Sequence, residues 1–135
     1  MDKNRLNINL GEEQVEEYSI KKMKDKITNA FIKADVHSII KQSEIDMHLT
    51  FIFKDFNIKI EGKLSRKIKT NDKASSEEIK DFVESEYTLL AQPLYAKASK
   101  IVASLSEEIF LFPLIVPVDE WNENENFTLN ISVAE

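Results

Sequence analysis

The residues of this chain best suited to metal binding or proton transfer are its two histidines, His37 and His48. An imidazole can ligate a metal or exchange a proton near neutral pH, and Asp46 would share a strand face with His48. Neither histidine has a second ligand at the spacing of known zinc sites. Because a catalytic site needs several convergent groups, we predict that Asp46 and His48 are a solvent-facing pair on a strand, with no metal site and no catalytic residue.

Other sequence patterns typical of enzymes are missing. The only glycines are Gly11 and Gly62, so neither a phosphate-binding loop nor a dinucleotide fingerprint can form. The absence of cysteine excludes disulfides and thiolate chemistry and fits a reducing, cytoplasmic location. Glu107 and Glu108 are adjacent on a predicted helix, so their carboxylates do not converge. We predict that the protein is not an enzyme and has no cofactor.

Charge and hydropathy limit the classes of partner. A net charge of −6 disfavours nucleic acid, because phosphate backbones are repelled. The longest apolar run, residues 109–118, is shorter than the roughly 20 residues of a membrane span, so no membrane insertion is expected. A basic stretch in the middle of the chain is either a solvated strand edge or a docking surface for a partner. Its residues are Lys59, Lys63, Arg66, Lys67 and Lys69.

The elements that would position these residues follow from periodicity. Alternating apolar residues predict strands at 6–10, 31–40, 45–53 and 56–64, with a tight connection at Lys54-Asp55. A shorter alternation predicts a last strand over 127–133. Residues 12–29 fit a helix, a strand or a loop. Gly62, inside a predicted strand, indicates a bulge or a close backbone approach.

A helix of about thirty residues is the clearest prediction. Ser75 and Glu78 have the spacing of a capping box at its start. An apolar stripe with steps of three and four continues from Val83 to Ile109, and Pro93 within it predicts a kink. We therefore expect one α+β domain over residues 1–135, in which a long kinked helix packs on one face of a four-stranded antiparallel sheet, with a possible extra C-terminal strand.

The order of strands, long helix and proline-bracketed apolar segment resembles the SecB family of export chaperones and its small relatives in Gram-positive bacteria. The resemblance covers roughly residues 33–121. The matching motifs are Pro93, Tyr95-Ala96, Phe112-Pro113 and Pro117-Val118 in the helix and the segment, the stretch 89–93, and the hairpin 53–58. It implies a SecB-like domain that binds unfolded or extended polypeptides and needs no catalytic residue.

The resemblance also implies site residues. The apolar segment would line a groove for client polypeptides, although it could equally pack as core. The client-binding candidates are Phe110, Phe112, Leu114, Ile115, Val116 and Trp121. SecB docks the translocation ATPase SecA through an acidic sheet surface, whereas the corresponding face here carries Lys59, Lys63, Arg66 and Lys67. The basic face argues against that partner.

Three functions stay open at this point. The first is a SecB-like holdase for unfolded clients, with a role in protein export as one form of it, and the second is an interaction protein of the same fold with one dedicated folded partner. The third, an enzyme or a nucleic-acid binder using the basic face, lacks the expected motifs. Surplus apolar surface on the helix and open sheet edges predict a homo-oligomer, a dimer or a tetramer.

Overall fold

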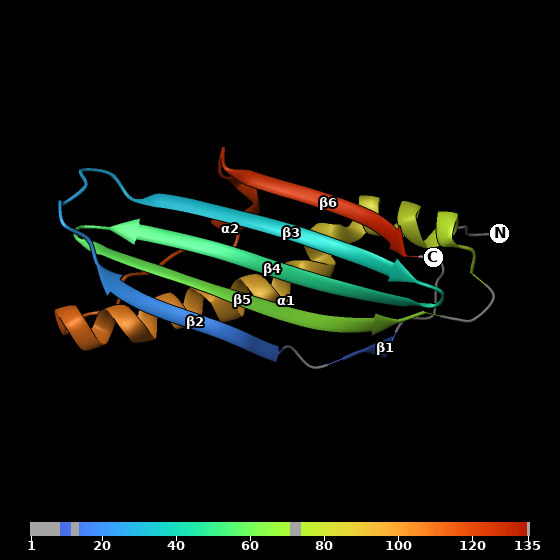
Figure 1. Cartoon of the computed structure of the whole chain (residues 1–135), viewed down its shortest axis with the longest axis horizontal. Coiled ribbons are helices and arrows are strands. Elements are labelled where there is room, and N and C mark those ends of the chain that lie inside the picture. The colour runs from blue at the N-terminus through green and yellow to red at the C-terminus, as the bar shows by residue number, and fades with distance from the viewer. Residues whose placement is uncertain (1–8, 12–13, 71–73, 135) are drawn as a thin grey trace.

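The molecule consists of a twisted sheet with one long helix across one of its faces (Figure 1). The computed structural model describes residues 9–11, 14–70 and 74–134. The strands are β1 (Asn9–Leu10), β2 (Gln14–Lys22), β3 (Phe31–Lys41), β4 (Glu44–Asp55), β5 (Ile58–Lys69) and β6 (Phe127–Ala134), and the helices are α1 (Ser76–Phe110) and α2 (Glu120–Glu123). The predicted α+β class, with a long helix on one face of a mostly antiparallel sheet, is confirmed.

The strand order is β2, β5, β4, β3 and β6. The short β1 also pairs with β5, next to the start of β2. The four long strands β2 to β5 pair antiparallel. The extra C-terminal strand exists as β6, and it pairs parallel with β3. The ambiguous stretch 12–29 contains β2, and most of the strand predicted over 6–10 lies outside the described residues.

The hairpin between β4 and β5 turns two residues later than predicted. The turn residues are Phe56 and Asn57, not Lys54 and Asp55, which belong to β4. Phe56 has a φ of 51°, an unusual value for a bulky side chain. Its amide donates to the Asp55 carboxylate at 2.9 Å. The shift follows from contacts of Phe56 with the end of the helix, described below, which no local pattern records.

Gly62 marks a close approach, as the sequence suggests. A Cβ at this position would lie 2.8 Å from ring atoms of Phe51 and 3.0 Å from the Glu17 carbonyl oxygen. The missing side chain lets the Phe51 ring lie under β5, where it meets Trp121 edge-on with ring centroids 5.4 Å apart. The irregularity in strand pairing is in β2, between Val15 and Glu17.

The core lies between the sheet and α1. Alternate residues of β3, β4 and β5 point toward the helix, and the buried side of α1 packs on them. The three largest fully buried side chains of the core are Trp121, Tyr95 and Phe51. The predicted capping box is present, because the Ser75 hydroxyl accepts from the Glu78 amide and the Glu78 carboxylate accepts from the Ser75 amide. The helix continues through Pro93.

Arg66 corrects one prediction from the sequence. The sequence pattern groups it with the lysines on the outward face, but it points toward the helix and is 4% exposed. Its guanidinium donates from Nη1 to the Leu90 carbonyl at 3.0 Å and from Nη2 to the Gly11 carbonyl at 3.2 Å. The reason is that successive side chains of β5 point to opposite faces of the sheet. Arg66, at an even-numbered position, therefore lies on the other face from Lys63 and Lys67.

Tyr95 gives the fold a testable response to pH. Burial raises the pKa of its phenol well above the ordinary value, and the nearby Tyr87 adds to the rise. Its hydroxyl has no hydrogen-bond partner among the described residues. The pKa of Tyr95 is higher in the folded than in the unfolded protein. The stability is therefore unaffected by this group below about pH 10 and falls as pH rises further, by about 1.4 kcal/mol per pH unit.

We therefore expect Tyr95→Phe to remove that part of the alkaline loss. Urea unfolding at about pH 8 and about pH 11 should show a smaller decrease in unfolding free energy for the variant than for the parent. At pH 8 the variant should be as stable or up to about 1 kcal/mol more stable, because an unpaired buried hydroxyl is lost. Identical pH dependence in the two proteins would contradict this prediction.

Candidate functional site

An exposed group of aromatic side chains lies where the end of α1 meets the β4–β5 turn. Phe110 is 5.5 Å from Phe56 and 5.7 Å from Phe112 between ring centroids. Phe56 is 44% and Phe112 51% exposed. We call these three residues the aromatic cluster. Three neighbouring phenylalanines with two open to solvent are unfavourable in an isolated protein, so the cluster is a candidate for binding another molecule.

The backbone around the cluster is strained. Phe56 and Leu111 both have positive φ, 51° and 64°, in a region that bulky residues rarely adopt. Such conformations cost about 1–3 kcal/mol each and persist where surrounding contacts hold them, often at binding sites. Leu111 terminates α1 by donating its amide to the Glu107 carbonyl at 2.9 Å, and its side chain is 91% exposed.

The segment after α1, residues 111–119, is held against the helix by two serines. The Leu114 amide donates to the Ser106 hydroxyl at 2.8 Å, and the Ser99 hydroxyl donates to the Val116 carbonyl at 2.7 Å. Ser99 also accepts from the indole N–H of Trp121 at 2.8 Å. The serines are seven residues apart, which puts them on one side of the helix. We call residues 111–119 the strap.

The strap contains both core residues and exposed residues. Val116 and Trp121 are buried, at 3% and 0% exposure, and belong to the core. Ile115 is 71% exposed, and Leu114 is half-buried. Of the predicted client-binding residues, the structure therefore gathers Phe110 and Phe112 in the aromatic cluster and leaves Ile115 open on the strap.

The aromatic cluster forms one wall of a hollow of about 300 Å³. Lys26 and Asn57 complete its lining. Lys26 belongs to the connection between β2 and β3, which two backbone hydrogen bonds fix to the β4–β5 turn. The amide of Met23 donates to the Asn57 carbonyl at 2.5 Å, and that of Ile27 to the Phe56 carbonyl at 2.8 Å.

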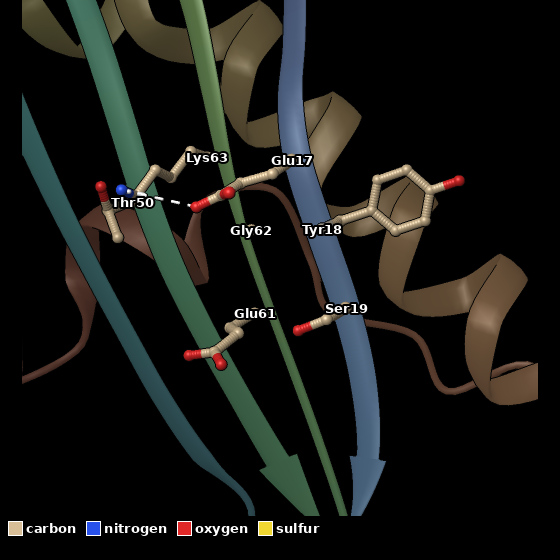
Figure 2. A pocket seen from close by; sticks show the side chains of 7 residues that line it. All are labelled: Glu17, Tyr18, Ser19, Thr50, Glu61, Gly62 and Lys63. Atoms are coloured by element: carbon tan, nitrogen blue, oxygen red, sulfur yellow. Dashed lines mark ion pairs between the residues drawn. The ribbon is translucent and has the colours of Figure 1, made fainter.

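A second hollow of about 300 Å³ lies between β2 and the C-terminal half of α1. Tyr18 forms the strand side of this hollow, and Figure 2 shows its ring directed to the helix side of β2, away from Glu17. Ile101 and Leu105 are the apolar residues on the helix side. The first hollow lies between the residues that follow β2 and the end of α1 with the strap. The second hollow lies between β2 and α1. We call the two hollows together the groove.

The outward face of the sheet is polar and internally paired. A shallow pocket of about 200 Å³ there includes Thr50, Glu61 and Lys63 (Figure 2). Three of the four outward lysines of β5 lie near carboxylates: Lys59 3.6 Å from Glu61, Lys63 3.4 Å from Glu17 and Lys67 3.9 Å from Glu44. Exposed pairs of this kind add only about 0–1 kcal/mol to stability, but they neutralise the charge of the lysines locally.

The two histidines are cross-strand neighbours on the same outward face. The Nδ1 atom of His48 lies 3.5 Å from Glu16, and its Nε2 atom lies 3.3 Å from Asp46. His37 is 3.2 Å from the Ser132 hydroxyl. Within the described part of the chain, no group of three or more potential ligands could hold a metal ion. No described helix is long and apolar enough to cross a membrane.

Comparison with solved structures identifies the fold. The SecB-like chaperone Rv1957 of Mycobacterium tuberculosis, in complex with a ChAD peptide from the antitoxin HigA1 (Rv1956), superposes with a TM-score of 0.65 at 8% identity, covering 82% of this chain and 86% of its own. The fold is SecB-like. A Streptococcus agalactiae protein of unknown function matches with a TM-score of 0.59 at 15% identity, covering 84% of this chain and 98% of its own. No family model and no curated protein matches the sequence.

The site residues missed by sequence reasoning come from segments that carry no motif. Tyr18 and Lys26 belong to the stretch of ambiguous periodicity, and the alternating pattern assigns Phe56 to a strand rather than to the turn. Ser99 and Ser106 have a detectable signal, because two serines seven residues apart interrupt an otherwise apolar helix face. Arg66 also has a signal, since it is out of phase with the lysines of its strand.

Proposed function

We propose that this SecB-like protein binds extended apolar segments of other polypeptides in the groove beside α1. The observation that carries the proposal is the aromatic cluster, which stays exposed although the adjoining strap is tied to the helix. The stretch of α1 from Lys97 to Phe110 is about 20 Å long, enough for roughly six extended residues. The peptide bound to the Mycobacterium tuberculosis neighbour supports a polypeptide ligand.

Two forms of this function are distinguishable. A holdase binds many unfolded clients, whereas a dedicated binder recognises one partner. The antitoxin peptide bound to the neighbour supports the dedicated binder as an alternative. Pull-down from the native host would yield many clients in the first case and one stoichiometric partner in the second. The lysines at 59, 63 and 67 remain a predicted docking surface for a folded partner. A homo-oligomer formed through the strand edges and the helix remains part of the proposal.

We expect the protein to suppress light scattering by reduced insulin when present in several-fold excess. The double variant Phe112→Ser/Ile115→Ser should raise the concentration needed for half-suppression by at least tenfold, because burial of Phe112 alone would contribute about 1.5–3 kcal/mol. Both side chains are exposed, so the fold should tolerate the changes.

The matched control is Leu89→Ser/Val133→Ser. Both control positions are exposed apolar side chains, at 65% and 40%, outside the groove. This variant should suppress scattering as well as the parent. Equal losses in the two double variants would mean that surface hydrophobicity in general is responsible, and no suppression by the parent would rule out the holdase form.

A further inference from the structure

The end of β2 and the connection from it to β3 concentrate positive charge in an acidic protein. Residues 21–26 contain Lys21, Lys22, Lys24 and Lys26 against Asp25, a net charge of +3 in a chain of net charge −6. All four lysine side chains are exposed. Clusters of like charge on a surface usually indicate either a solvated segment or a site for a ligand of opposite charge.

Two structural observations distinguish this cluster from the basic face of β5. The lysines at 22, 24 and 26 make no ion pair with any described residue, whereas Lys59, Lys63 and Lys67 each lie within 4 Å of a carboxylate. The connection is also fixed in place by the hydrogen bonds of Met23 and Ile27 to the β4–β5 turn. Lys26 therefore lines the hollow of the aromatic cluster.

The other half of the groove has the same sign of charge. Lys97 and Lys100 line the second hollow with a single acidic residue, Glu108. No described residue forms an ion pair with either lysine. Apolar side chains in both hollows are thus flanked by lysines, which is the arrangement complementary to a segment with acidic residues beside its apolar ones.

We propose that the groove selects extended polypeptide segments in which aspartate or glutamate flanks aromatic or aliphatic residues. This selectivity rests on the polypeptide-binding function proposed above and specifies its ligand. The net negative charge of the whole protein does not reverse it, because charges are screened beyond about 8 Å at physiological salt and the lysines of the groove act at contact distance. The apolar residues supply affinity, and the lysines supply the choice of sequence.

Three synthetic twelve-residue peptides with identical aromatic and leucine positions test the proposal. Three flanking positions are Asp in the first peptide, Asn in the second and Lys in the third. In calorimetric titrations at low salt the Asp peptide should bind roughly tenfold tighter than the Asn peptide, from three partly exposed ion pairs, and the Lys peptide should bind most weakly. At about 0.5 M NaCl the three dissociation constants should converge, because screening removes the ionic contribution.

The test variant is Lys26→Gln/Lys97→Gln/Lys100→Gln, which removes the three lysines that line the groove. The control is Lys59→Gln/Lys63→Gln/Lys67→Gln, which removes the same charge from the outward face. The test variant should lose most of the preference for Asp over Asn while its affinity for the Asn peptide changes less than about twofold. The control should keep the preference. Equal affinity of the parent for the Asp and Lys peptides overturns the charge selectivity alone, whereas no binding of any peptide overturns the proposed function with it.

Discussion

Trp121→Ala should destabilise the protein by about 3–5 kcal/mol, because it empties a large site in the core. Trp121 is fully buried, its ring meets Phe51 edge-on, and its indole N–H donates to Ser99. Removal of the ring leaves a cavity between the sheet and the helix. It also removes the donor to Ser99, which holds the strap through the Val116 carbonyl.

Urea or thermal unfolding would measure this loss. Trp121→Phe is the matched control, because it keeps an aromatic ring near Phe51 but cannot donate to Ser99. Its loss should be smaller, about 1–2 kcal/mol. A loss under about 1 kcal/mol for Trp121→Ala would mean that Trp121 is not part of the core.

Arg66→Ala should have the second-largest effect, a loss of about 2–3 kcal/mol in unfolding free energy. The substitution removes both guanidinium donors, which reach the Leu90 carbonyl on α1 and the Gly11 carbonyl beside β2. A buried carbonyl that loses its donor costs about 1–3 kcal/mol. The loss should therefore appear in urea unfolding at neutral pH.

Two neighbouring substitutions make the interpretation specific. Lys67→Ala, one residue along on the opposite face, should change stability by less than about 0.5 kcal/mol, because its side chain is exposed. Arg66→Lys should lie between the two, since one ammonium group cannot reproduce the planar fork of donors that reaches two carbonyls. If Arg66→Ala and Lys67→Ala are equally stable, the buried hydrogen bonds of Arg66 contribute nothing to the fold.

Local periodicity in the sequence was sufficient for most of the fold. The alternation of Ile45 to Phe53 corresponds to β4, and the stripe from Val83 to Ile109 corresponds to α1. The capping box of Ser75 and Glu78 fixed the start of the helix. These patterns are local because hydrogen bonding within one helix, or the pleat of one strand, determines which side chains share a face.

The turn and the new edge strand show where periodicity fails. Residues 14–22 form β2, whose side chains are exposed on both faces except for the half-buried Ile20, so no apolar alternation indicates a strand. The β4–β5 turn includes Phe56, a residue that turn statistics disfavour at positive φ. Its position depends on contact with Phe110, fifty-four residues away in sequence.

The sequence by itself determined which residues are apolar, where the long helix and most of the strands lie, and that the segment 110–118 is unusual. Only the tertiary structure decided which of those apolar residues are open. Ser99 and Ser106 hold Val116 and Leu114 toward the helix, and Phe112 and Ile115 are left facing solvent. The tertiary structure likewise placed Lys59, Lys63 and Lys67 near carboxylates from β5 itself, β2 and β4, and left Lys26 beside the aromatic cluster. The physical reason is that a residue's own element fixes the direction of its side chain, whereas its exposure and its charge partners depend on elements distant in sequence that pack against it.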